Sequence, residues 1–276
     1  MTSATAWEPA YARRAEGMRA SEIRELLKLL EQPDIISFAG GIPDPAVFPA
    51  QEAASAYAEA LSGDATAATA LQYSVSEGYR PLREWIADYM ASRGVPASSE
   101  NIVITAGSQQ ALDFLGKLML TPGDTALVTA PTYLGALQAF AAYEPRYDTI
   151  RPEQTNRTPS SYRDAAQKAA PGARVKFAYV VPDFANPTGE TLSWRARTTL
   201  LDLAGTPDIP VIEDTAYQHC ASRAQTFRRF KPSTWRGAAL STNRGSSISA
   251  HFRRRSLRDC GSAGSVRRKH LSGASC

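Results

Sequence analysis

The sequence predicts an α/β fold, with a parallel or mixed sheet and helices on both faces. Short apolar runs alternate with helical segments between residues 101 and 214. Strands that are apolar along their length are typical of sheets covered on both faces. Because strands and helices that alternate indicate parallel connections, we expect ligands beyond the carboxyl ends of the strands.

Three helices are predicted before residue 101. Apolar residues recur at helical spacing in 21–32. The segments 51–61 and 79–92 are also expected to be helical, with Pro81 in the first turn of the second, where proline is tolerated. A stretch rich in Gly and Pro, 40–45, interrupts the chain between the first two helices.

From residue 101 the alternation of strands and helices is regular. Strands are predicted at 101–105, 125–130, 176–182 and 209–214, and helices at 108–120, 134–143 and 194–204. The last of these strands ends in two carboxylates, Glu213 and Asp214.

The charge distribution divides the chain near residue 217. Residues 1–217 contain 26 of the 27 acidic side chains and 18 Lys and Arg, whereas residues 218–276 contain 13 Lys and Arg and a single acid, Asp259. All three Cys and all three His lie in the second part. Ser, Arg and Gly dominate there without helical or strand periodicity, which is typical of a disordered basic tail.

Polar residues follow the predicted strands where ligands are expected. Ser108 and Gln109 open a helix, and free N–H groups at a helix N-terminus favour an anion, although Ser is also a common N-cap. Tyr133 follows the next strand, where it either stacks on a flat ring or packs structurally.

The last two predicted strands end in further candidates. Asn186 lies in an Asn-Pro-Thr-Gly turn, which places an amide at a rigid position but is also ordinary turn chemistry. Asp214 ends a buried strand, with Tyr217 three residues later. A carboxylate in this place is either a helix N-cap or the partner of a buried cation.

These segments together resemble the class I/II aminotransferases, which are fold-type I pyridoxal-phosphate enzymes, and within them the 2-aminoadipate and kynurenine-type group. The resemblance covers about residues 20–217 and depends on six segments: ISFAGGIPDPAVFP (36–49), LQYSVSEGYRPLREWIA (71–87), TAGSQQAL (105–112), APTY (130–133), VVPDFANPTG (180–189) and VIEDTAY (211–217). It implies a homodimer that uses pyridoxal 5'-phosphate to transfer an amino group from an L-amino acid to a 2-oxo acid.

By this resemblance, Ser108 and Gln109 hold the phosphate of the cofactor at a helix N-terminus. Tyr73 reaches the phosphate bound by the neighbouring subunit, and Tyr133 stacks on the pyridine ring. All four residues are therefore expected to bind the cofactor.

The resemblance also assigns the polar atoms of the ring. Asn186 and Tyr217 bind its 3-hydroxyl oxygen, and Asp214 pairs with the pyridine nitrogen and keeps it protonated. A protonated ring withdraws electrons from the substrate Cα. Gly40 and Gly41 are expected to line the substrate side, where the backbone can approach closely.

The resemblance further divides the chain into an N-terminal arm (1–45), part of the large cofactor-binding domain (46–217) and an aberrant tail (218–276). We expect the sheet to lack any strand after Tyr217. The C-terminal small domain, with the Arg for the substrate α-carboxylate, is expected to be missing.

The lysine that forms a Schiff base with the cofactor in this family belongs to a Ser-Lys motif, and it also acts as general base and acid. The tail contains Lys231 and Lys269, and neither follows a Ser. We therefore expect no catalytic lysine and negligible transaminase activity from this chain.

A displaced reading frame is one explanation of the tail. Read one base out of frame, the codons permitted around Ser241–Gly264 spell D-E-S-R-F-I-Y-L-G-T-F-S-K-T-L-x-P-G-L-R-V-G-W, which resembles the missing family segment. The lysine codon then spans Arg253 and Arg254. We infer a net loss of one base near Gln218.

Other functions fit parts of the sequence. The basic residues of the tail fit nucleic-acid binding, although high-GC coding read out of frame also yields Arg, Ser and Gly. Three Cys and three His are residue types that can bind zinc, but their spacing matches no compact ligand pattern, so we expect no metal. A non-catalytic protein that still binds the cofactor is the main alternative.

Two further classes are not expected. A transcriptional regulator with a fused DNA-binding module has no room before residue 20. No apolar run approaches the length of a membrane span, and the first twenty residues lack the apolar core of a secretion signal, so we expect a cytoplasmic protein.

Overall fold

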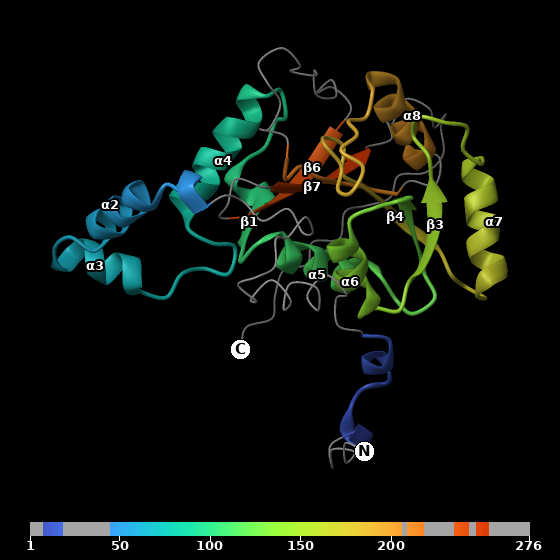
Figure 1. Ribbon diagram of the computed structural model, residues 1–276, viewed down its shortest axis with the longest axis horizontal. Coiled ribbons are helices and arrows are strands. Elements are labelled where there is room, and N and C mark those ends of the chain that lie inside the picture. Colours follow the sequence, from blue (N-terminus) through green and yellow to red (C-terminus); the bar gives the residue numbers. More distant parts are fainter. Residues whose placement is uncertain (1–7, 19–44, 206–208, 218–234, 243–246, 254–276) are drawn as a thin grey trace, which may run out of the picture.

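A seven-stranded sheet forms the centre of the molecule (Figure 1). The computed structural model describes residues 8–18, 45–205, 209–217, 235–242 and 247–253. The order of the strands is β1-β6-β7-β5-β4-β2-β3, and all of them run parallel except β7. The strands are β1 (Ile102–Thr105), β2 (Thr125–Thr129), β3 (Arg146–Ile150), β4 (Val175–Val180), β5 (Val211–Asp214), β6 (Trp235–Thr242) and β7 (Ser247–Arg253).

The helices follow the order that the sequence predicts, with two additions. They are α2 (Ala50–Ala60), α3 (Asp64–Leu71), α4 (Arg80–Ser92), α5 (Ser108–Met119), α6 (Leu134–Ala141), α7 (Pro159–Ala169) and α8 (Trp194–Gly205). Short 3-10 turns are found at Glu8–Ala10, Arg13–Gly17, Pro45–Val47 and Ser99–Asn101. In the described ranges, no helix combines the length and apolarity needed to cross a membrane.

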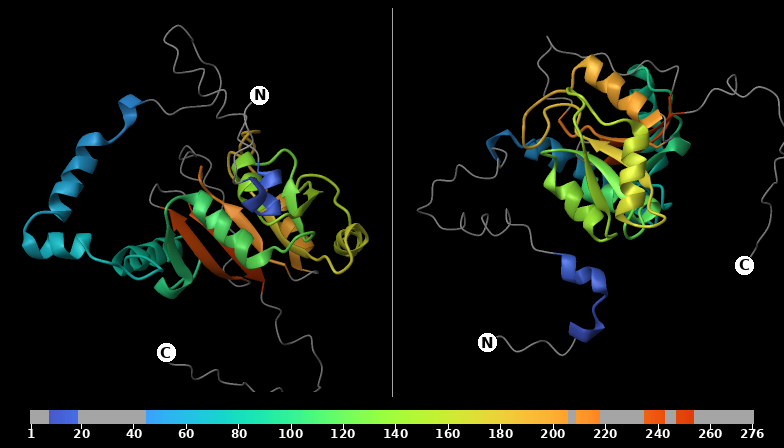
Figure 2. Two further views of the ribbon diagram at one scale, coloured as in Figure 1. Left: turned by 90° about the horizontal axis from the view of Figure 1, so that it is seen from below. Right: turned by 90° about the vertical axis from the view of Figure 1, so that its right-hand side faces the viewer.

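The two faces of the sheet are covered by different helix pairs (Figure 2). Along β4, Phe177 and Tyr179 face α5 and α6, whereas Ala178 and Val180 face α7 and α8. This alternation is the period of two that a strand imposes on its side chains. The ring of Phe140 in α6 lies 5.0 Å from Phe177. Both faces are therefore buried, and the predicted α/β architecture is confirmed.

The helices α2 and α3 project away from the sheet (Figure 1). Neither contains a buried side chain, and large apolar residues such as Tyr57 and Leu71 are exposed on them. By contrast, α4 packs on β1, and Met90 and Ile102 belong to one buried apolar cluster. The α2–α3 unit has no covering element within the described residues.

The expectation that the sheet lacks strands after Tyr217 is wrong. Two strands from that stretch, β6 and β7, lie between β1 and β5 and pair with both. The sequence of β7 alternates apolar and polar residues through Ile248, Ala250 and Phe252, a period that the Arg-rich and Ser-rich composition obscured. Without this pair, β1 and β5 would leave backbone groups unpaired inside the sheet.

Other parts of the predicted tail, and the helix predicted at 21–32, lie outside the described residues. The prediction of disorder is contradicted for 235–242 and 247–253, which form strands.

Candidate functional site

The parallel strands bring the predicted site segments to one edge of the sheet. The strands β1, β2, β4 and β5 all run in the same direction, so their carboxyl ends share that edge. Each is followed by one of the polar segments identified from the sequence. The expectation that ligands bind at this edge therefore has a structural basis.

The first of these segments is the N-terminus of α5. Gly107 precedes the helix with φ of 97°, and it provides no side-chain cap. The first-turn N–H groups of α5 therefore have no side-chain acceptor from the cap position, and such groups favour an anion. Ser108 is half-buried at this point, and the side-chain amide of Gln109 donates to the carbonyl of Gly135 at 2.8 Å.

The second segment carries Tyr133 at the start of α6. Its ring lies against Gly135, where an added Cβ would come within 2.4 Å of the Tyr133 Cζ. Because Gln109 binds the carbonyl of the same glycine, Gly135 joins the start of α5 to the aromatic ring. Gly135 thus provides the space that Tyr133 occupies.

The third feature is a buried carboxylate at the end of β5. The hydroxyl of Tyr179 donates to Oδ2 of Asp214 at 2.9 Å, and both side chains are buried. The other oxygen, Oδ1, is buried without a hydrogen-bond partner. A buried polar atom left without a partner costs about 1–3 kcal/mol, so this oxygen is placed to accept from a ligand.

A second buried polar atom lacks a partner, and it belongs to the segment before Tyr133. This is Oγ1 of Thr132; with Oδ1 of Asp214 it makes up the unpaired buried side-chain polar atoms of the described residues. Thr132 follows β2 and Asp214 ends β5, and the carboxyl ends of these parallel strands lie at the same edge of the sheet. The unpaired polar atoms are therefore concentrated at the predicted ligand-binding edge.

The pKa values of the cluster follow from its burial. Burial raises the pKa of Asp214, although the Tyr179 hydroxyl and the nearby backbone N–H of Ala216, which forms no hydrogen bond to Oδ1, act in the opposite direction. Burial also raises the pKa of Tyr133, with further contributions from the charges of Asp214 and Tyr217. These contributions indicate that Asp214 and Tyr217 lie near the Tyr133 hydroxyl.

The raised pKa of Asp214 predicts a pH-dependent stability. Because the folded state holds this proton more tightly, Asp214 lowers the free energy of unfolding as pH rises from its ordinary pKa toward the raised value. The variant Asp214→Asn should therefore gain stability relative to the parent over that window. Urea unfolding of the cofactor-free chain at pH values from 4 upward, about the ordinary pKa, measures the difference.

The matched variant Asp124→Asn should give the opposite sign. Asp124 is buried, which raises its pKa, but hydrogen bonds from Thr121 and the backbone N–H of Arg174, with Lys176 3.2 Å away, lower it overall. Its stabilising effect is present above the ordinary pKa and lost as pH falls through the lowered one. Equal pH slopes for the two variants would contradict the assignment.

The remaining predicted site residues are less buried or lie outside the described residues. Asn186 is exposed in a turn closed by hydrogen bonds between the backbones of Ala185 and both Gly189 and Glu190. Tyr217 is partly exposed just beyond Asp214. Tyr73 is 97% exposed, and no contact of its side chain with the other predicted residues is found in the described part of the chain. Gly40 and Gly41 lie outside the described residues.

Two site features were missed by the sequence reasoning, Tyr179 and Gly135. A signal for Tyr179 exists, because a hydroxyl inside an otherwise apolar buried strand needs a hydrogen-bond partner. Gly135 gives no such signal, since its importance depends on where the ring of Tyr133 packs.

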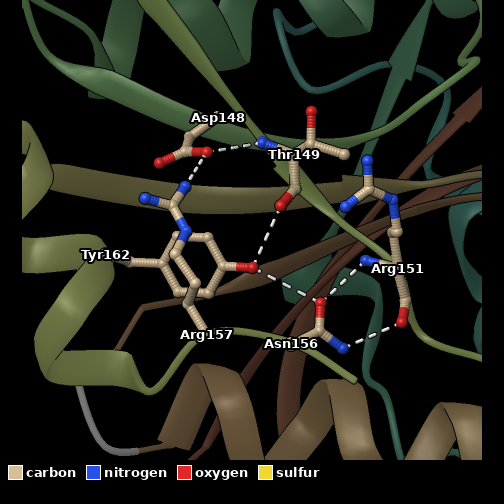
Figure 3. Close-up of polar contacts among 6 residues, drawn as sticks. All are labelled: Asp148, Thr149, Arg151, Asn156, Arg157 and Tyr162. Carbon is tan, nitrogen blue, oxygen red and sulfur yellow. Dashed lines mark hydrogen bonds and ion pairs between the residues drawn. The ribbon is translucent and has the colours of Figure 1, made fainter. Parts of the chain in front are cut away.

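A cleft lies away from these residues, between the loop after β3 and helix α8. It is an open cleft of about 700 Å³, and none of the predicted cofactor residues lines it. Its loop is held by a polar network (Figure 3), in which Tyr162 donates to the carbonyl of Thr149 at 3.0 Å and Arg157 pairs with Asp148. Asn156 bonds both the N–H and the carbonyl of Arg151.

Comparison with known proteins gives the family. The sequence model described as "Aminotransferase class I and II" matches residues 33–241, which is more than half of the chain. The chain belongs to this family. Its predicted fold, the large domain of fold-type I pyridoxal-phosphate enzymes, is thereby confirmed.

Individual relatives are also aminotransferases. The chain is 42% identical over 213 residues to aromatic-amino-acid aminotransferase 1 of Thermococcus litoralis, which covers 76% of this chain and 51% of the relative. It is also 42% identical over 212 residues to 2-aminoadipate transaminase of Thermus thermophilus, with 77% and 51% covered. The chain thus spans about half the length of these curated relatives.

Solved structures of family members share the fold. A multiple substrate aminotransferase from Thermococcus profundus matches with a TM-score of 0.71 and 34% identity, over 90% of this chain and 64% of that one. The kynurenine aminotransferase of Pyrococcus horikoshii, described in complex with PMP, matches with a TM-score of 0.69 and 34% identity, over 90% and 63%.

Proposed function

We propose that this chain is the cofactor-binding part of a pyridoxal 5'-phosphate-dependent aminotransferase. The observation that carries the proposal is the buried Oδ1 of Asp214, an acceptor without a donor at the edge where Tyr133 and the start of α5 meet. A protonated pyridine nitrogen is a donor of the required kind. The intact enzyme would transfer an amino group from an L-amino acid to a 2-oxo acid.

The residues at this edge fit the parts of the cofactor. The N–H groups of the first turn of α5, with Ser108 and Gln109, would hold the phosphate, since a helix N-terminus favours an anion. Tyr133 would stack on the ring, and Asn186 and Tyr217 would bind its 3-hydroxyl oxygen. When bound, the cofactor supplies an electron sink for the substrate Cα.

The carboxylate of Asp214 would hold a proton on the ring nitrogen. Its burial keeps water from competing for that nitrogen, and the negative charge favours the protonated ring. The role of Gly40 and Gly41 on the substrate side stays a prediction.

We further infer that two copies of the chain associate. The exposed side chain of Tyr73 and the uncovered helices α2 and α3 support this inference, since Tyr73 would complete the phosphate site of a second copy. A cytoplasmic location, expected from the sequence, also stays a prediction.

We do not propose that this chain catalyses transamination, because its sequence contains no Ser-Lys motif after Asp214. We infer that it is a non-catalytic form of the enzyme that keeps the non-covalent part of the cofactor site. A reading frame displaced near Gln218 is the proposed cause, with the lysine codon across Arg253 and Arg254. Here Arg253 ends β7, and Arg254 lies outside the described residues.

Binding of pyridoxamine 5'-phosphate tests the proposed function. This ligand has the ring and phosphate of the cofactor but no aldehyde, so it does not react with surface lysines. We expect saturable binding by fluorescence titration, weakened about twofold to tenfold by Tyr133→Ala through the loss of ring stacking. The matched variant Tyr147→Ala, on edge strand β3, should bind like the parent. A parent chain without saturable binding would refute the proposal.

A further inference from the structure

We infer that Tyr179 is a positioning residue, which fixes the Asp214 carboxylate so that one oxygen is committed to Tyr179 and the other is presented to the cofactor ring. This inference rests on the proposed function. It is carried by the 2.9 Å hydrogen bond from the Tyr179 hydroxyl to Oδ2 and by the buried, unpaired Oδ1.

The register of the two strands explains why these side chains meet. Tyr179 in β4 pairs with Ile212 in the adjacent parallel strand β5. Because side chains alternate between faces, Asp214 lies on the same face as Ile212, two residues further along. The long side chain of Tyr179 therefore reaches Asp214 diagonally across the two strands, and its hydroxyl meets the carboxylate.

The ring of Tyr179 has little freedom to move. It is fully buried, and it meets the ring of Phe140 edge to face, with centroids 5.9 Å apart and planes at 81°. Phe140 is itself fully buried between α6 and the sheet. The hydroxyl is thus held at a fixed point, and the carboxylate that it binds is held with it.

The hydrogen bond affects the charge of Asp214 as well as its orientation. A hydroxyl donor stabilises the ionised carboxylate over the neutral acid, and only the ionised form attracts a protonated ring nitrogen. Burial works in the other direction, since it disfavours the charge. Tyr179 therefore offsets part of the effect of burial and keeps Oδ1 available as an acceptor.

The test compares two Tyr→Phe variants, each of which removes one buried tyrosine hydroxyl. In Tyr179→Phe the affinity for pyridoxamine 5'-phosphate should fall on the order of tenfold, the effect of losing a hydrogen bond to a charged group. The pH below which binding is lost should also move upward. The control is Tyr162→Phe. The hydroxyl of Tyr162 donates to the carbonyl of Thr149, on the opposite face of the sheet from Tyr179. This variant should change neither the affinity nor the pH dependence of binding.

A double variant separates positioning from general loss of structure. In an Asp214→Asn background, Tyr179→Phe should have no further effect on affinity, because the carboxylate that it acts on is gone. If Tyr179→Phe binds like the parent with the same pH dependence, or if its effect persists in the Asp214→Asn background, the inference is overturned.

Failure of the proposed cofactor binding can be distinguished from failure of the role of Tyr179. If the parent chain does not bind pyridoxamine 5'-phosphate, the pairing is still tested in the cofactor-free protein. There Tyr179→Phe should extend the Asp214-dependent decrease in stability to higher pH, because the donor that favours the ionised form in the folded state is lost. An unchanged pH dependence in that measurement would overturn the role of Tyr179 itself.

Discussion

A one-base insertion near the Gln218 codon is expected to give a protein that binds the cofactor covalently through a new lysine and transaminates. The present chain should do neither, because its late lysines, Lys231 and Lys269, do not follow a Ser. A positioned side chain that moves protons contributes about 10²–10⁴-fold to a rate, so at least that increase in activity is expected. The physical basis is the proposed cofactor site, whose described residues up to Tyr217 lie before the proposed displacement of the frame.

Borohydride reduction followed by peptide mapping measures the covalent bond. With pyridoxal 5'-phosphate, the restored protein should give one reduced lysine adduct, encoded across the codons of Arg253 and Arg254. The control is the restored gene with that lysine codon changed to an alanine codon, which should lose the adduct and the activity. If the insertion yields no adduct, or if sequencing shows that no one-base change restores Ser-Lys, the displaced frame is refuted.

Most elements between residues 80 and 214, though not β3 or α7, could be predicted because local and tertiary signals agree there. The strand β4 is apolar on both faces, and helices α5 and α6 cover one of those faces while α7 and α8 cover the other. Helix α4 begins beside Pro81, as the proline at its start predicts. In such segments burial reinforces the pattern, so the sequence identifies the element type.

Helices α3 and α7 and strands β3, β6 and β7 were missed, and α3 and β3 have weak local signals. Helix α3 (DATAATAL) has no apolar face, and the edge strand β3 (RYDTI) is polar and half-exposed. Strands β6 and β7 belong to a stretch whose composition indicates a disordered tail, yet they fill the place between β1 and β5. Their position depends on strand pairing over long sequence separations, which local periodicity does not contain.

Part of the candidate site could be predicted from the order of strands and helices. Segments that follow parallel strands must share one edge, so Ser108, Tyr133 and Asp214 were expected near one another. The partner of Asp214 was missed because it depends on register. Only the pairing of Tyr179 with Ile212 places the hydroxyl and the carboxylate on one face.

Replacement of Arg197 should have the largest effect on stability among single substitutions of charged residues in α8. Its side chain is 5% exposed, and its guanidinium binds the carboxylate of Asp183 at 2.6 Å. It also donates to the backbone carbonyls of Pro182 and Leu192. The variant Arg197→Met would leave a nearly buried carboxylate without its cation, which costs about 3–5 kcal/mol of the free energy of unfolding.

The matched control is Arg195→Met, the same substitution two residues earlier on an exposed position of the same helix. It should change the free energy of unfolding by less than about 0.5 kcal/mol. Urea unfolding measures both variants, and similar values for the two would contradict the structural role of Arg197.

The substitution should also weaken ligand binding at the proposed cofactor site. Arg197 ties together Pro182 and Leu192, the two ends of the loop that carries Asn186. Under conditions where Arg197→Met remains folded, this loop should be less ordered, and pyridoxamine 5'-phosphate should bind more weakly than it does to Arg195→Met. Arg197→Lys keeps the charge but not the planar set of donors, so it should recover part of the stability and little of the affinity. Full recovery of both by lysine would show that charge alone, without the fixed donor geometry, holds the loop in place.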